Sequence, residues 1–219
     1  MNTSTIPLPS LALLDRLCPL LSVPDCPAIK ARQAVDVYEL WQAWEKEAGL
    51  ECPVPHWAIV WPAAQILARY LLDHPELVKG KEILEIGCGG AVASISAKLS
   101  GGRQVIANDI DPVTLAVAEE NALANRTEIL FDATNWIGSK SMPPADLILI
   151  ADFFYLKTDS LMLTAQLHEW KNQGIEIIIA DSGRAFVPDQ QDGILHAQDL
   201  AVNQDLEGKN QRQVRIFKF

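Results

Sequence analysis

The sequence lacks any uninterrupted apolar run of the ~18–20 residues that a membrane-spanning helix requires. Residues 1–27 are fairly apolar, but they have no basic start, and Asp15 and Arg16 interrupt them, unlike a secretory signal peptide. We therefore expect a cytoplasmic protein that does not bind membranes.

Basic residues are also scarce. The chain has 18 lysines and arginines against 28 acidic residues, which gives a net charge of −10. A nucleic-acid-binding protein needs a basic surface to neutralise phosphates, so this charge argues against nucleic acid as a partner. The acidity suits a basic protein partner or serves solubility alone.

The sequence has only four cysteines and four histidines. No two cysteines have the C-x-x-C spacing, and no histidine follows them at a zinc-finger interval. This pattern predicts reduced thiols and no metal site, with a disulfide between Cys18 and Cys26 as the alternative.

Two common nucleotide-binding motifs are absent. No Gly-Lys-Ser/Thr follows the glycines, which excludes a P-loop. Gly87 and Gly89 fit the start of a dinucleotide-binding motif, but Val92 occupies its last position in place of glycine or alanine. This departure disfavours a nicotinamide- or flavin-dependent oxidoreductase.

The length allows one α/β domain and a modest extension, since the chain has 219 residues of which 49% are hydrophobic. The segment 1–55 contains several prolines and predicts a helical N-terminal cap, with helices at Leu11–Leu21 and Ala34–Gly49. Residues 56–219 are the predicted main domain.

In the main domain, short apolar runs alternate with helical patterns, as in a buried parallel sheet whose strands are joined by helices. The predicted strands are Glu82–Ile86, Val105–Asp109, Glu128–Phe131, Leu147–Ile150 and Ile175–Ala180, and the predicted helices are Pro62–His74, Val92–Leu99, Val113–Asn125 and Leu161–Lys171. A final hairpin of Leu200–Leu206 and Gln213–Phe219 predicts an antiparallel strand at or near the sheet edge.

The strongest motif is Glu85-x-Gly87-Cys88-Gly89, which lies between an apolar strand and a helix of small residues. Glycines permit a sharp turn and a close ligand approach, and open α/β sheets bind ligands at the carboxyl ends of their strands. The motif resembles motif I of the Rossmann-like methyltransferases that use S-adenosylmethionine (SAM), with Ala91 in place of the third glycine. The resemblance implies a mostly parallel seven-stranded sheet, with SAM as cofactor and S-adenosylhomocysteine as product. It also implies that Glu85, Gly87, Cys88 and Gly89 lie beside the amino-acid end of the cofactor.

A second carboxylate, Asp109, lies 24 residues after Glu85 at the end of the next predicted strand. A carboxylate there can accept hydrogen bonds from both ribose hydroxyls. Asp111 and Pro112 suit the N-cap and first turn of the next helix. We therefore predict that Asp109 binds the ribose, that its neighbour Ile110 also lies at the cofactor site, and that Asp111 is structural.

Asp132 and Trp136 follow the third predicted strand. The resemblance to the methyltransferases implies that Asp132 meets the adenine amino group and that Trp136 flanks the ring. The alternative is a turn acid and a packing tryptophan.

Asp152-Phe153-Phe154-Tyr155 leaves the predicted fourth strand, which should lie beside the first. Together with Trp57–Gln65, the glycine loop, Ala107–Pro112 and the segment 181–184, it resembles the electron-transfer flavoprotein β-subunit lysine methyltransferase group over roughly residues 56–185. The resemblance implies a protein-lysine methyltransferase.

Within that resemblance, Asp152 and Tyr155 are the predicted catalytic residues. Asp152 would orient the acceptor amine, assist its deprotonation and border the cofactor together with Trp61, while Tyr155 would contact the cation through its ring. Trp57, Trp61 and the two phenylalanines would exclude water, with core packing as the alternative for each. Arg184 would bind a carboxylate of the partner or pair with Asp181, and the local pair is favoured.

Several functions compete on these residues. A protein-lysine methyltransferase leads, ahead of a methyltransferase for a small-molecule amine or for another protein side chain. An inactive SAM-binding protein is disfavoured because the acids and the D-x-x-Y element are all present. We expect a protein substrate and favour a monomer.

Overall fold

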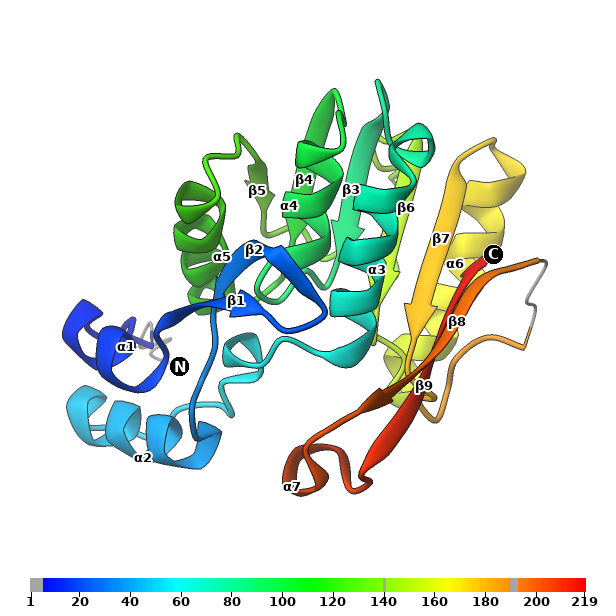
Figure 1. Cartoon of the computed structure of the whole chain (residues 1–219). Coiled ribbons are helices and arrows are strands. Elements are labelled where there is room, and N and C mark those ends of the chain that lie inside the picture. The colour runs from blue at the N-terminus through cyan, green and yellow to red at the C-terminus, as the bar shows by residue number, and fades with distance from the viewer. Residues whose placement is uncertain (1–5, 140, 190–192) are drawn as a thin grey trace.

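The computed structural model describes residues 6–139, 141–189 and 193–219. Within these ranges, seven strands form one sheet in the order β5-β4-β3-β6-β7-β9-β8 (Figure 1). Their bounds are β3 Glu82–Ile86, β4 Gln104–Asn108, β5 Leu130–Asp132, β6 Leu147–Ala151, β7 Glu176–Asp181, β8 Ile194–Ala201 and β9 Gln211–Lys218. The pairs from β5 to β7 are parallel, and β9 is antiparallel to both β7 and β8. The predicted α/β fold is confirmed.

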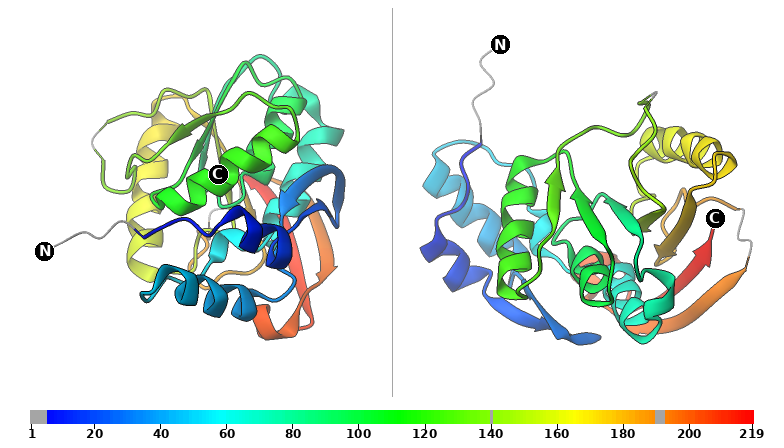
Figure 2. Two further views of the ribbon diagram at one scale, coloured as in Figure 1. Left: turned by 90° about the vertical axis from the view of Figure 1, so that its left-hand side faces the viewer. Right: turned by 90° about the horizontal axis from the view of Figure 1, so that it is seen from above.

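Helices cover both faces of this sheet. On one face lie α3 Pro62–Asp73, α4 Val92–Leu99 and α5 Pro112–Ala124, and on the other lies α6 Lys157–Asn172 (Figure 2). Alternate residues of a strand point to opposite faces. Ile83 therefore packs with the α3 and α4 side chains, whereas Leu84 and Ile86 pack with those of α6. Burial on both faces explains why these strands are continuous apolar runs.

The N-terminal segment is not purely helical, which corrects the prediction. Helix α1 covers Leu11–Leu17 and α2 covers Val37–Ala48, but β1 Leu20–Val23 and β2 Cys26–Arg32 form an antiparallel hairpin between them. The predicted helix ends before Pro19, because proline does not fit a helix interior. This N-terminal hairpin packs on α3, α4 and α5. The division at residue 55 stays a prediction.

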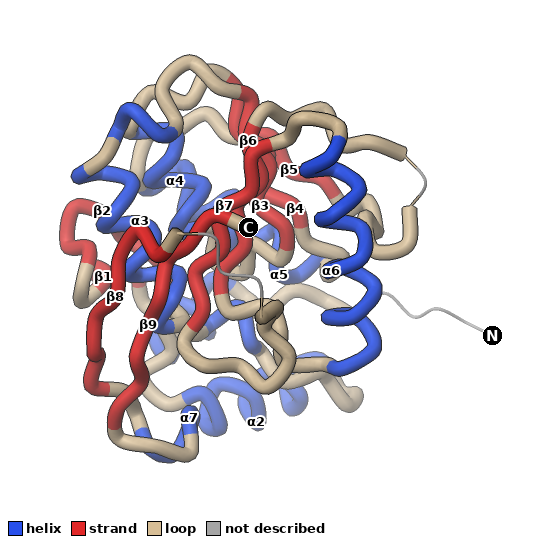
Figure 3. Tube along the Cα trace, turned by 90° about the vertical axis from the view of Figure 1, so that its right-hand side faces the viewer, coloured by secondary structure: helices blue, strands red, loops and turns tan. Residues whose placement is uncertain are grey.

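The C-terminal segment also differs from the prediction. Residues predicted as the strand Leu200–Leu206 belong partly to β8 and partly to a short helix, α7 Gln204–Glu207. Asn203 caps this helix by accepting from the backbone N–H of Asp205, and Gly208 ends it at a φ of +65°. The antiparallel strand β9 lies one place inside the edge, which β8 occupies (Figure 3).

The carboxyl ends of the five parallel strands meet at one edge of the sheet. The hairpin of β8 and β9 extends past the end of β7 at this edge and carries α7 at its tip (Figure 1). All four cysteines are buried and free. Among the described residues, no helix is long and apolar enough to cross a membrane.

Candidate active site

The glycine loop after β3 is shaped by close contacts. Gly87 has a φ of +67°, and a Cβ placed on it would lie 2.5 Å from Cδ2 of Phe153. Gly89 has a φ of +51°, and a Cβ there would meet nothing within 4 Å. The backbone N–H of Cys88 donates to the carbonyl of Asn108 at 2.9 Å, which ties the loop to β4. Gly87 therefore allows Phe153 to approach, and the loop is open at Gly89.

Glu85 lies beneath this loop and is 1% exposed. Its Oε2 accepts from the backbone N–H of Ser94 at 2.8 Å and from the Ser94 hydroxyl at 2.5 Å. Burial raises the pKa of Glu85 to about 7, although the Ser94 hydrogen bonds lower it. The carboxylate thus joins the end of β3 to the first turn of α4. Its predicted contribution to the cofactor pocket stays a prediction.

Asp109 lies at the end of β4, next to the glycine loop. Its carboxylate accepts from the backbone N–H of Gly89 at 3.3 Å and from that of Asp111 at 3.1 Å. Burial raises the pKa of Asp109, and the backbone hydrogen bonds lower it. Asp111 caps α5, as predicted, by accepting from Val113 N–H and the Thr114 hydroxyl. Ile110 is 67% exposed between the two acids.

Asp132 is held by its neighbours at the end of β5. One carboxylate oxygen accepts from Trp136 Nε1 at 2.8 Å and from Asn108 Nδ2 at 2.9 Å, and the other accepts from Thr134. Burial raises the pKa of Asp132, but these hydrogen bonds outweigh it and lower the pKa. Both oxygens therefore have local donors, and the predicted adenine contact stays a prediction.

Asp152 follows β6 at a φ of +51° and is 6% exposed. Its Oδ2 accepts from the backbone N–H of Ala63, in the first turn of α3, at 2.9 Å. Its Oδ1 accepts from the backbone N–H of Ser182 at 3.0 Å, from the Ser182 hydroxyl at 2.6 Å and from Arg184 Nε at 2.9 Å. Asp152 therefore joins the ends of β6 and β7 to the start of α3.

The aromatic residues of the D-x-x-Y element divide into two groups. Phe154 is fully buried in the α6 face of the core. Phe153 lies against Gly87, and its ring centroid is 6.4 Å from that of Tyr155. Tyr155 is 55% exposed, so part of its ring is accessible to solvent.

The two tryptophans before α3 also separate. Trp57 is buried, and its ring meets that of Trp44 edge-on at 6.0 Å, so it is a core residue. Trp61 donates to the carbonyl of His56 at 3.2 Å. The guanidinium of Arg184 lies over the Trp61 ring at 5.0 Å from its centroid.

The sequence-based prediction that the side chain of Arg184 pairs with that of Asp181 is wrong. Asp181 uses Oδ1 to accept from the backbone N–H groups of Gly183 and Arg184, and its pKa rises to about 6 because it is buried. The guanidinium instead pairs with Asp152 and with Glu207 of α7. Glu207 was not predicted as a partner of Arg184, because it lies in a short helix 23 residues further along the chain.

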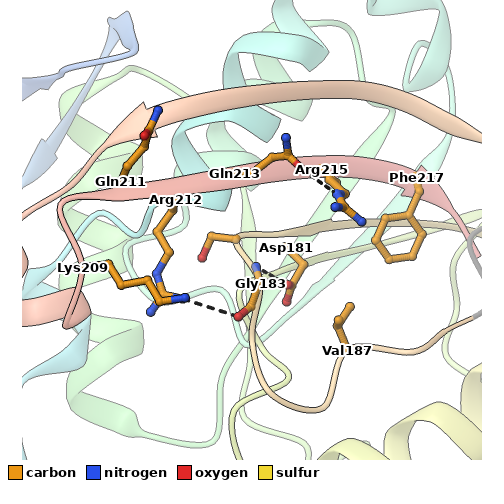
Figure 4. Close-up of a pocket in the computed structure, with 10 residues that line it drawn as sticks. Asp181, Gly183, Val187, Lys209, Gln211, Arg212, Gln213, Arg215 and Phe217 are labelled. Carbon is orange, nitrogen blue, oxygen red and sulfur yellow. Dashed lines mark hydrogen bonds between the residues drawn. The ribbon is translucent and has the colours of Figure 1, made fainter.

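A pocket of ≈ 270 Å³ lies between β9 and the segment after β7 (Figure 4). Asp181, Gly183, Arg212 and Arg215 are among its lining residues. None of the residues predicted to bind the cofactor lines it. This pocket is therefore not the predicted cofactor site.

Comparison with known proteins places this arrangement in a family. The sequence model of the family described as lysine methyltransferase matches residues 51–192. The chain belongs to the lysine methyltransferase family. The match includes the glycine loop, Asp109 and the D-x-x-Y element, and it ends before α7.

Named relatives agree with this family. The electron transfer flavoprotein beta subunit lysine methyltransferase of Danio rerio is 41% identical over 143 residues, which cover 63% of this chain and 54% of that protein. The Xenopus laevis protein of the same name is 36% identical over 170 residues, which cover 75% and 66% respectively. The chain therefore spans between about half and two thirds of the length of these relatives.

Solved structures share the fold of this lysine methyltransferase family member. The tRNA (uracil-54, C5)-methyltransferase of Pyrococcus abyssi, in complex with S-adenosyl-L-homocysteine, matches with a TM-score of 0.51 at 18% identity. The match covers 71% of this chain and 38% of that chain. At this identity the likeness shows the fold alone.

Proposed function

We propose that this chain transfers a methyl group from SAM to a lysine amine of a protein substrate. The observation that carries the proposal is the meeting of three strand ends at one sheet edge. The open glycine loop of β3 lies between Asp109 of β4 and the D-x-x-Y element of β6, since β3 pairs with both of these strands.

The residues at this edge fit SAM. The space beside Gly89 is open, because this residue has no side chain and a Cβ placed on it would meet nothing within 4 Å. The carboxylate of Asp109 accepts from neighbouring backbone N–H groups, among them those of Gly89 and Asp111. Carboxylate oxygens have about four lone-pair sites between them, so hydrogen bonds from ribose hydroxyls can be accepted as well. The exposed side chain of Ile110 offers an apolar surface to the adenine ring.

SAM supplies an electrophilic methyl group: a new N–C bond forms as the S–C bond breaks, and the sulfur leaves as the thioether of S-adenosylhomocysteine. The lysine amine must attack in its neutral form, and its ordinary pKa is about 10.4, so a proton must leave first. Beyond this, the protein chiefly has to hold two reactants in line, which contributes up to ~7–11 kcal/mol in favourable systems.

Asp152 is suited to positioning rather than to free proton transfer. Its two oxygens already accept four hydrogen bonds, from Ala63, Ser182 and Arg184. It fixes the end of β6, from which Phe153 and Tyr155 project. We propose that the proton of the ammonium leaves to solvent as the amine enters.

Tyr155 is the residue that meets the amine. Burial raises the pKa of its phenol above 10, and the charges of Asp109 and Asp159 raise it further while Arg184 lowers it. The phenol therefore stays protonated at neutral pH and does not act as a base. Its ring face attracts the cationic amine, an interaction of about 0.5–2 kcal/mol.

The acceptor is a protein in this proposal because of the family and its relatives. The first acceptor to test is the electron-transfer flavoprotein β-subunit, which the names of the relatives specify for them. The monomeric state and the cytoplasmic location inferred from the sequence stay predictions.

The test is to incubate the purified chain with SAM that carries a tritiated methyl group, first with electron-transfer flavoprotein and then with a lysate of cells that lack this protein. The labelled protein is hydrolysed and its amino acids are separated. Label in methyllysine supports the proposal. Label in methylarginine or in small molecules alone contradicts the lysine assignment, and bound SAM without any transfer contradicts the enzymatic function.

A further inference from the structure

Glu207 connects α7 to the candidate active site. Its carboxylate is 3% exposed and accepts from both terminal nitrogens of Arg184, each at 3.0 Å. It also accepts from Nε of Arg212 at 3.0 Å. Together with Asp152, these residues form a cluster of two acids and two arginines, here called the Arg184 cluster.

Within the Arg184 cluster, the guanidinium of Arg184 has three partners. Its Nε donates to Asp152, its two terminal nitrogens donate to Glu207, and its face lies over the Trp61 ring. A two-pronged pair of this kind fixes the orientation of a planar guanidinium as well as its distance. Glu207 thus sets where Arg184 stands relative to Asp152 and Trp61.

The charges of the cluster balance, since two carboxylates face two guanidiniums. Loss of the Glu207 charge would leave Arg184 with Asp152 as its remaining carboxylate partner in the cluster. The guanidinium would then be free to turn away from Trp61 and to pull on the end of β6. Displacements of about 1 Å at a site that aligns two reactants can lower a rate by about 10²-fold.

We infer that Glu207 is a positioning residue for methyl transfer: through Arg184 it holds Asp152 and the D-x-x-Y element in line with the acceptor. This inference rests on the proposed function. It gives α7 a role at the active site, although α7 lies outside the segment that the family model matches.

A structural role for the hairpin alone is separable from this positioning role. Asn203 caps α7 by accepting from the backbone N–H of Asp205 at 2.8 Å. Asn203→Ala removes this cap, and so weakens α7, without changing any side chain of the Arg184 cluster.

The experiment compares four variants of the full chain: Glu207→Gln, Glu207→Asp, Asn203→Ala and Asp205→Asn. Asp205 is the matched control, because it lies on the same short helix, is exposed and is not part of the Arg184 cluster. The readouts are the SAM dissociation constant by calorimetry, the kcat and KM for the protein acceptor, and the melting temperature.

We expect Glu207→Gln to lower kcat by about 10-fold to 100-fold, with the SAM dissociation constant within about twofold of the parent. Glu207→Asp should recover part of kcat, because it restores the charge at a shorter reach. Asn203→Ala should melt earlier but keep kcat within about threefold, and Asp205→Asn should match the parent.

Parent-like kcat in Glu207→Gln overturns the inference, as does an equal loss of kcat in Asn203→Ala, which would show that the stability of α7 alone matters. If Glu207→Gln does not fold, Arg184→Lys decides: lysine keeps the charge but cannot form the two-pronged pair with Glu207, so a folded variant with the kcat of the parent overturns the inference. A parent protein that binds SAM but transfers no methyl group overturns the proposed function itself, which distinguishes the two failures.

Discussion

At the scale of single residues, Asp109 and Asp111 are separated by one residue but have different roles. Asp109 faces the glycine loop, whereas Asp111 is turned into the first turn of α5. We expect Asp109→Ala to weaken SAM binding by at least about tenfold, because charge-assisted hydrogen bonds contribute about 1.5–3 kcal/mol. Calorimetric titration with SAM measures this loss.

Asp111→Ala is the matched control for that measurement. It removes the N-cap of α5 and should lower the free energy of unfolding by about 1 kcal/mol while leaving SAM affinity within about threefold. An unchanged dissociation constant in Asp109→Ala would remove that residue from the cofactor site.

Asp152→Asn tests the D-x-x-Y element. Asparagine keeps one oxygen that can accept from Ser182 or Arg184, but its amide nitrogen cannot accept from the Ala63 N–H. We expect SAM binding to persist and the rate of methyl transfer to fall by about 10²-fold, because the end of β6 is no longer fixed. Calorimetry and transfer of tritiated methyl from SAM give the two numbers, and full activity would contradict the assigned role.

Glu85 makes the stability of the protein depend on pH. An unperturbed glutamate ionises near pH 4.5, and Glu85 in the folded protein ionises near 7 because it is buried. The folded state therefore binds the proton more tightly. The stabilisation from this proton is full below about pH 4.5 and is lost as the pH rises through about 7.

Glu85→Gln isolates this effect, since glutamine can accept from Ser94 and does not ionise. Between about pH 5 and about pH 8, the parent should lose up to about 3 kcal/mol more unfolding free energy than the variant. Urea denaturation at the two pH values measures it. The comparison cancels Asp181, whose pKa of about 6 acts in both proteins, and parallel pH profiles would show that Glu85 has no such effect.

At the scale of elements, the N-terminal hairpin supports the glycine loop through Asn121 of α5. The side chain of Asn121 accepts from the backbone N–H of Arg32 in β2 at 2.8 Å and donates to the carbonyl of Gly90 at 3.0 Å. Asn125, one turn later, bonds the backbone of Lys30 but does not touch the loop.

These two asparagines allow a paired test. Asn121→Ala leaves a buried backbone N–H and a partly buried carbonyl without this partner, and it should cost about 2–4 kcal/mol of unfolding free energy, together with a several-fold loss of SAM affinity. Asn125→Ala should lower stability by a smaller amount and leave SAM affinity unchanged. Denaturation and calorimetry provide both readouts, and equal affinities in the two variants would disconnect the hairpin from the cofactor site.

The elements that the sequence predicted well are the buried ones, because burial requires a recognisable pattern of apolar residues. Strands β3 and β6 are apolar runs because both faces are covered, and the predicted helix Val92–Leu99 matches α4 residue for residue. The N-terminal hairpin was missed because β1 is exposed at three of its four residues and has no alternating pattern. Strand β8 is likewise largely exposed, so its bounds were misplaced.

The candidate site divides in the same way. Glu85, the glycines and Asp109 lie close to one another along two adjacent strands, so motif spacing could find them. The partners of Arg184 could not be found, because they depend on where the β8–β9 hairpin returns to the sheet and not on any local pattern. Asp152 and Glu207 bind the Arg184 guanidinium together, through different nitrogens.

At the scale of the whole molecule, the sheet edge should respond to its ligand as a unit. A ligand that binds only the folded state at 100 times its dissociation constant adds about 2.7 kcal/mol of stability. For a chain of this size, that corresponds to a rise in melting temperature of roughly 5–10 °C. We expect S-adenosylhomocysteine to produce this rise in a thermal-shift assay and NADH at the same concentration to produce none. A shift with NADH alone would revive the oxidoreductase alternative.

The position of β9 has a consequence for how the protein is made. This strand lies between β7 and β8 in space but follows both in the chain. During translation, 29 further residues (182–210) are added after β7 before β9 begins, a delay of about 1.5–6 s at ~5–20 residues per second. In that interval the backbone N–H and C=O groups at the edge of β7 are unpaired, and β8 has no strand to pair with. The nascent chain is therefore most open to pairing with a wrong strand just before its last hairpin closes.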